Sequence, residues 1–106
     1  MEIRFLYSKD CPSHEEALSR LRSVLKEEGV NNTIDIRTVE TEEQASSLHF
    51  VGSPTILING RDIDPQSNPH YALACRAYRL EDGRISPLPS IMMIRKAVRT
   101  AKENRR

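Results

Sequence analysis

Cys11 carries the most specific chemistry that can be read from this chain. It follows an apolar run, residues 1–7, and precedes Pro12, where a helix is expected to begin. The positive end of a helix dipole favours a thiolate, which is the nucleophilic form of cysteine. His14 would share the first helical turn and could stabilise that thiolate or relay a proton. Asp10 works in the opposite direction, because a nearby carboxylate disfavours a second negative charge. The stretch predicts a nucleophilic thiol, against the plainer alternative of an inert cysteine beside a surface histidine.

Cys75, the second cysteine, separates two versions of this chemistry. If it lies close to Cys11, it can displace a mixed disulfide between Cys11 and a substrate, leaving a bond between the two cysteines. If it is a small buried hydrophobe, Cys11 acts alone and needs an external thiol such as glutathione. Separation in sequence does not fix a distance in space, so both versions stay open.

Metal binding is a different class of answer. Cys11, His14 and Cys75 offer two soft sulfurs and an imidazole, which suit zinc, copper or mercury. A C-x-x-H motif with one distant cysteine lacks a complete set of four ligands, and His49 and His70 have no spacing that completes it. We therefore expect no metal ligands and no cofactor, and keep metal binding as an alternative. A non-catalytic interaction module is the third class.

The elements that position Cys11 follow from hydrophobic periodicity. Residues 1–7 read as a strand, residues 12–28 as an amphipathic helix that stops at Gly29, and residues 33–39 as a strand of alternating pattern. A strand, a helix and a strand within so short a stretch predict two parallel strands with a right-handed connection.

The middle of the chain contains a capping box and a buried strand. Thr41 and Gln44 have the spacing of a capping box, which predicts a short helix over residues 42–50. Residues 55–58 form an uninterrupted apolar run, typical of a strand buried on both faces, and Asn59-Gly60 signals a turn after it.

The last third of the chain is less regular. Residues 61–73 contain Pro65, Asn68 and Pro69 and are expected to form a long loop of the kind that often carries function. Alternation over residues 74–80 predicts a fourth strand, antiparallel to the third and ending in a turn at Asp82-Gly83. A final helix is expected from about Pro89 to Glu103.

The order β-α-β-α-β-β-α resembles the thioredoxin-like superfamily over nearly the whole chain, residues 1–106, as one domain. Two motifs carry the resemblance. Cys11-Pro12-Ser13-His14 matches the C-x-x-C position with its last residue changed, as in small bacterial members with a C-P-x-H motif. Gly52-Ser53-Pro54-Thr55 matches the loop that carries the family's cis-proline.

The resemblance implies an α/β fold with a four-stranded mixed sheet flanked by helices, and a thiol-disulfide oxidoreductase-like function. It also implies that the Ser53-Pro54 bond is cis and that this loop lies beside Cys11, where it accepts an extended substrate as an added strand. Pro12, Ser53, Pro54 and Thr55 would then shape the substrate site. The chain departs from the family in having no tryptophan before Cys11, no second cysteine in the motif and a longer stretch over residues 61–74.

Composition narrows the remaining classes. The 106 residues are enough for one domain, and no apolar run is long enough to span a membrane. Because Met1 begins a strand directly, we expect no secretory signal. We expect a cytoplasmic monomer whose partner is a protein or small-molecule thiol or disulfide, glutathione included. A net charge of +1 offers no general attraction to nucleic acid or to a membrane. The cations near the C-terminus are interpreted as a solvated helix end: Arg95, Lys96, Arg99, Lys102, Arg105 and Arg106.

Overall fold

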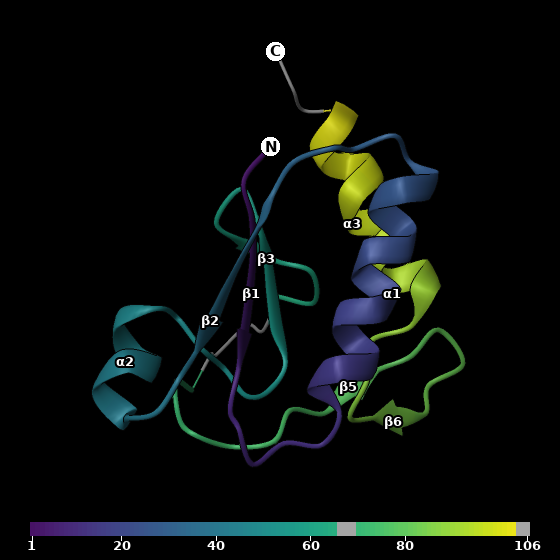
Figure 1. Cartoon of the computed structure of the whole chain (residues 1–106). Helices are drawn as coiled ribbons and strands as arrows, with labels where there is room; N and C mark the ends of the chain where they lie inside the picture. Colours follow the sequence, from purple (N-terminus) through teal and green to yellow (C-terminus); the bar gives the residue numbers. More distant parts are fainter. Residues whose placement is uncertain (66–69, 104–106) are drawn as a thin grey trace.

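Strand β1 (Ile3–Tyr7) is the centre of a mixed sheet. The computed structural model describes residues 1–65 and 70–103. In it, β1 pairs in parallel with β2 (Ile34–Thr38) and antiparallel with β3 (Thr55–Ile58), and β3 pairs with β4 (Arg61–Asp62). The resulting order β2-β1-β3-β4 (Figure 1) confirms the predicted mixed α/β architecture and its parallel first pair.

Helices cover both faces of this sheet. Helices α1 (His14–Glu27) and α3 (Ile91–Glu103) lie side by side on one face, and α2 (Glu42–Ser47) lies on the other (Figure 1). Alternation along β1 divides the core accordingly: Phe5 is buried with α1 and α3, whereas Leu6 is buried in a second cluster with Ala45 of α2. Both faces of β1 are therefore apolar, which explains its nearly continuous hydrophobic sequence.

Strand β3 is buried at all four positions, as its apolar sequence predicted. The turn that follows it was also predicted correctly. Asn59 and Gly60 have φ angles of 54° and 79°, and two successive left-handed residues suit the twist of a tight hairpin. The chain therefore returns at once along the free edge of β3 as β4.

Only Tyr78–Arg79 of the predicted fourth strand over residues 74–80 form a strand, and the predicted pairing of this strand with the third is wrong. The hairpin after β3 fills the edge of the sheet with β4, so residues 74–80 find no open edge there. Instead, Cys75 makes an isolated parallel bridge to Ser53, and β5 (Tyr78–Arg79) pairs with β6 (Ile85–Ser86) in a separate two-stranded sheet. The alternation in the sequence is nonetheless real, because Arg76 and Tyr78 are buried and their neighbours are exposed. Of the loop residues singled out from the sequence, Asn68 and Pro69 lie outside the described residues.

The helices are shorter than predicted at several ends. Helix α1 begins at His14 with Ser13 as its N-cap, so Pro12 precedes the helix instead of opening it. A turn closed by a hydrogen bond from Cys11 N to Ser8 O comes before Pro12. Helix α2 ends at Ser47, and the following turn brings Phe50 back into the core.

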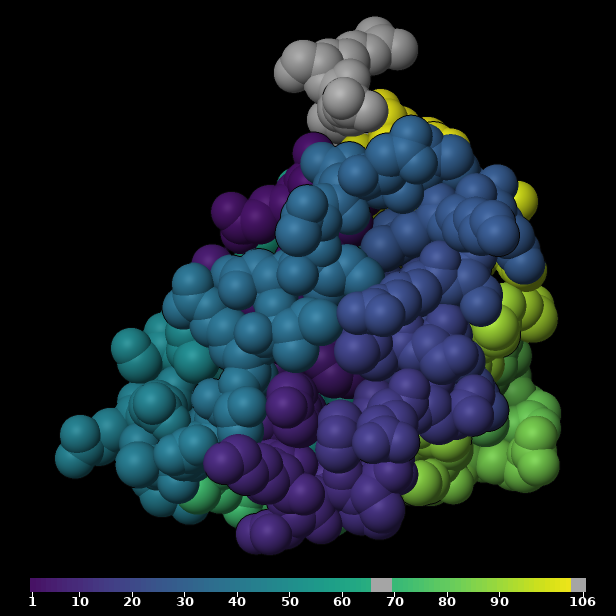
Figure 2. Space-filling view, in the orientation of Figure 1, coloured from purple at the N-terminus to yellow at the C-terminus, as the bar shows by residue number. Residues whose placement is uncertain are grey.

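The loop between β1 and α1 lies at the surface (Figure 2, purple, at the bottom), and its residues Lys9 and Asp10 are exposed. Beside it, the same view shows side chains of α1 next to those of β2. Within residues 1–65 and 70–103, no helix is both long and apolar enough to cross a membrane.

The predicted capping box of α2 is present and can be tested. The Thr41 hydroxyl accepts from Gln44 N at 3.1 Å, and the Gln44 side chain accepts from Thr41 N in return. We expect Thr41→Ala to lower the free energy of unfolding by about 1 kcal/mol, because backbone donors at the helix start lose their partner. Urea denaturation measures the loss. Ser46→Ala, at an exposed position of the same helix, is the control, and an equal effect of both changes would contradict the capping role.

Candidate functional site

Residues 72–76, called here the crossing segment, pass beneath the sheet at the end where β1 leads into α1 (Figure 1, green). Ser53, just before β3, binds this segment through both its backbone amide and its carbonyl oxygen. Ser53 N donates to Ala74 O at 2.8 Å, and Ser53 O accepts from Arg76 N at 3.0 Å. These two bonds form the parallel bridge between Ser53 and Cys75. The bridge places Cys75 beside the loop that precedes Pro54.

Cys11 also contacts Ser53. Its side chain is only 3% exposed, and its thiol donates to Ser53 O at 3.4 Å. The Ser53 hydroxyl accepts from Ser8 N at 3.0 Å, which fastens the loop after β1 to the same point. Ser53 is itself completely buried. One serine thus joins the segment that carries Cys11 to the segment that carries Cys75.

The two cysteines interact electrostatically. The pKa of the Cys75 thiol is raised, first by the negative charge of a Cys11 thiolate and then by partial desolvation and a side-chain interaction with Cys11. Two thiols that influence each other in this way do not readily ionise together, because the second charge would face the first. Together with the contacts that both cysteines make at Ser53, this interaction places Cys11 and Cys75 close to each other. Both cysteines are free, Cys11 being buried and Cys75 exposed.

His14 lies close to Cys11, but its described contacts are with other atoms. Its Nδ1 is 2.8 Å from Cys11 O, and its ring stacks on Tyr7 with centroids 4.3 Å apart. Because a carbonyl oxygen only accepts, Nδ1 must carry the hydrogen in this bond. The ring is therefore fixed beside the Cys11 backbone. Its predicted effect on the sulfur stays a prediction.

The proline loop has the form that the resemblance implies. The Ser53-Pro54 peptide bond is cis, and Pro54 and Thr55 are buried. Pro54 O accepts a 2.5 Å hydrogen bond from the Tyr78 hydroxyl. Burial raises the pKa of Tyr78, so this hydroxyl keeps its proton and remains a donor. Pro12, the other residue predicted to shape the site, is exposed.

Arg76 is a site residue that sequence reasoning missed. Its side chain is 3% exposed, pairs with Asp62 at 2.7 Å and donates to Asp64 O at 2.7 Å. The guanidinium also lies over the Tyr78 ring, 4.3 Å from its centroid. The signal in the sequence was its alternation phase, which Arg76 shares with Tyr78. A buried cation next to Cys75 thus connects the crossing segment to β4.

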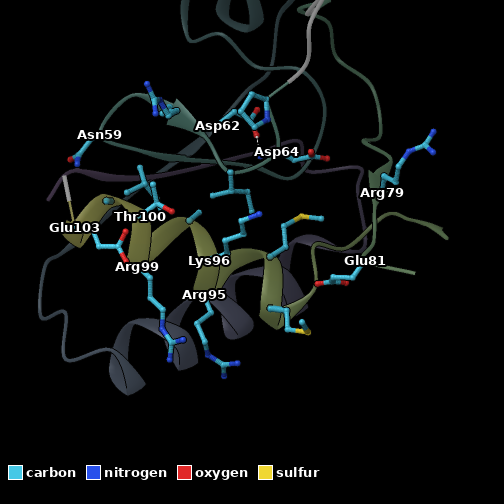
Figure 3. Close-up of a pocket in the computed structure, with 18 residues that line it drawn as sticks. Asn59, Asp62, Asp64, Arg79, Glu81, Arg95, Lys96, Arg99, Thr100 and Glu103 are labelled. Atoms are coloured by element: carbon cyan, nitrogen blue, oxygen red, sulfur yellow. Dashed lines mark hydrogen bonds between the residues drawn. The ribbon is translucent and has the colours of Figure 1, made fainter. Parts of the chain in front are cut away.

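A separate groove of about 1180 Å³ lies between α3 and the β3–β4 hairpin (Figure 3). Lys96 points across it toward Asp62 and Asp64, whereas Arg95 and Arg99 point away from it. These two arginines pair with glutamates at the end of α1, Arg95 with Glu27 at 2.7 Å and Arg99 with Glu28 at 3.2 Å.

The cations expected to form a solvated helix end are therefore partly neutralised by α1. Lys102 also approaches Glu28, at 3.5 Å, and Arg105 and Arg106 lie outside the described residues. Neither cysteine lines the groove.

Comparison of the chain with protein-family models, curated proteins and solved structures finds no match. In the part of the chain that the structure describes, no three His, Cys, Asp or Glu side chains are grouped so as to hold a metal ion.

The contact between Gly52 and Arg76 tests how closely the crossing segment must approach the proline loop. Gly52 has a φ of +131°, and a Cβ there would lie 3.0 Å from Arg76 Cα. We expect Gly52→Ala to lower the free energy of unfolding by about 3 kcal/mol, from backbone strain and overpacking combined. Urea denaturation again provides the measurement.

Gly29→Ala is the matched control for this change. Gly29 also has a left-handed φ, +70°, but a Cβ there would meet nothing within 4 Å. It should cost only about 1 kcal/mol, the conformational penalty alone. Equal losses for the two variants would show that the approach of Arg76 to Gly52 is not tight.

Proposed function

We propose that this chain is a thioredoxin-like domain whose Cys11 and Cys75 form a dithiol for thiol-disulfide exchange. The observation that carries the proposal is the arrangement around Ser53. Its carbonyl accepts from the Cys11 thiol, and its backbone bridges to Cys75. The order of strands in the mixed sheet, with Cys11 between β1 and α1, supports the thioredoxin-like assignment.

In the proposed reaction, Cys11 acts as the nucleophilic thiolate and Cys75 supplies the second sulfur. Reduction of a substrate disulfide transfers two electrons from the pair: two thiols become one Cys11–Cys75 disulfide, and the substrate leaves as two thiols. The negative charge of a Cys11 thiolate raises the pKa of Cys75, which supports the two thiols acting as one coupled pair. His14 would keep the backbone of Cys11 in place through its Nδ1 bond to Cys11 O.

The arrangement around Ser53 also bears on whether the second sulfur is internal or comes from an external thiol. An external thiol such as glutathione is required for resolution only when no internal thiol is within reach. Because Cys75 lies beside Cys11, we propose that the internal pair completes the exchange, and we keep external thiols and disulfides as exchange partners.

Mild oxidation tests the dithiol directly. We expect oxidised protein to lose both alkylatable thiols without dimerising, and peptide mass spectrometry to identify an intramolecular Cys11–Cys75 bond. Cys11→Ser and Cys75→Ser are the matched controls, and neither can form the bond. Persistence of a free Cys75 in folded, oxidised wild-type protein would rule out the dithiol.

The electrostatic coupling of the pair predicts a specific pH effect. In wild-type protein, a Cys11 thiolate raises the pKa of Cys75, so alkylation of Cys75 should require higher pH. Replacing Cys11 with serine removes that charge, and the apparent pKa of Cys75 should fall. The measurement is the rate of iodoacetamide labelling at Cys75 against pH, resolved by peptide mass spectrometry.

Labelling in concentrated urea is the control for this pH effect, since the two proteins should then give the same profile. An apparent pKa in folded Cys11→Ser equal to or above the wild-type value would contradict the coupling.

A further inference from the structure

Cys11 and Cys75 differ sharply in solvent exposure. Cys11 is only 3% exposed and is covered by the Ser53 backbone with which its thiol bonds. Cys75 is exposed, and the alanines at positions 74 and 77 are small and exposed as well, whereas Arg76 between them is buried. A disulfide arriving from solution therefore meets Cys75 before Cys11.

The backbone beside Cys11 is also engaged. Ser53 N and Ser53 O already bond to Ala74 O and Arg76 N, so neither is free to pair with an incoming extended strand. The crossing segment is held at two further points. Leu73 N lies 3.3 Å from the Glu42 carboxylate, and Ala72 N donates to Phe50 O at 3.2 Å. The position beside the Ser53 backbone is thus occupied by the chain's own crossing segment, in which Cys75 is exposed.

We propose that the exchange partner is attached at Cys75, so that the mixed disulfide forms on Cys75 and Cys11 is the internal sulfur that resolves it. This inference rests on the proposed dithiol function and reverses the order expected from the position of Cys11 at the helix start. The partner is a disulfide that reaches an exposed sulfur without pairing to the Ser53 backbone, and oxidised glutathione is the probe for it.

The proposed steps balance as follows. Cys75 loses its proton to solvent and attacks one sulfur of the external disulfide; one external thiolate leaves and a Cys75 mixed disulfide remains. The Cys11 thiolate then attacks the Cys75 sulfur, which forms the Cys11–Cys75 bond and releases the second external thiolate. The external disulfide is reduced by two electrons, and the protein dithiol is oxidised by two.

Reduction of the internal disulfide by an external thiol begins at the same exposed sulfur. An external thiolate attacks the exposed Cys75 sulfur of the internal disulfide, and Cys11 departs as a thiolate. The exposure of Cys75 therefore determines which sulfur is attacked in both directions.

The test is to map where oxidised glutathione attaches under native conditions. Cys11→Ser should accumulate a stable glutathione adduct on Cys75, located by peptide mass spectrometry. Cys75→Ser should form its adduct on Cys11 at least about tenfold more slowly, because a buried sulfur is poorly accessible to exchange. Wild-type protein quenched early should carry a transient adduct on Cys75, followed by the internal disulfide.

Two controls test whether burial causes the difference in reaction rate between the two serine variants. In concentrated urea, Cys11→Ser and Cys75→Ser should react at similar rates, which shows that the native difference comes from burial. Cys11→Ala provides a second variant at the buried position, and it should also accumulate the adduct on Cys75. Faster adduct formation on Cys11 than on Cys75, or an early wild-type adduct on Cys11, would overturn the proposal.

The experiment also separates this inference from the function on which it rests. If wild-type protein keeps a lasting adduct on Cys75 and never forms the internal bond, the dithiol function fails. If the internal bond forms but the early adduct is on Cys11, the function stands and the proposed order of attachment is wrong.

Discussion

The structure around the two cysteines depends on the complete hydrogen bonding of one buried serine. Ser53 is fully buried, and a buried backbone without partners would carry a large desolvation cost. Its amide, carbonyl and hydroxyl all have partners: Ala74, Arg76 and Ser8. Each partner belongs to a segment that carries or adjoins a cysteine. Satisfying Ser53 therefore brings Cys11 and Cys75 close together.

A buried ion pair extends this arrangement to the edge of the sheet. Arg76 pairs with Asp62 of β4, and its ring contact with Tyr78 leads back to Pro54 through the tyrosine hydroxyl. A buried pair of charges is costly to desolvate, and its value lies as much in fixing geometry as in stability. Here it ties the backbone that carries Cys75 to a strand of the main sheet.

Local sequence signals predicted the parts of this fold that local interactions determine. The buried strand β3, the turn at Asn59-Gly60 and the capping box at Thr41 depend on neighbouring residues, and all three are present. Whether residues 74–80 join the main sheet depends on which segment pairs with the edge of β3. Alternation of buried and exposed residues does not decide this, because it is the same for a sheet strand and for a segment bridged to a loop.

The candidate site also has a part that local sequence signals predicted and a part that they did not. Cys11, His14 and the proline loop could be named from motifs, because each motif lies within a few residues. The proximity of Cys75 and the role of Arg76 required long-range pairing with Ser53 and Asp62, which no short-range pattern encodes.

The tyrosines of this protein give its thiol end an optical signature. The chain has three tyrosines and no tryptophan. Tyr7 stacks on His14, Tyr78 lies beneath Arg76, and Tyr71 stacks on His49 near the start of the crossing segment. All three tyrosines thus lie in or next to the segments that hold the cysteines. The intrinsic ultraviolet emission of the protein consequently reports on the surroundings of its sulfurs.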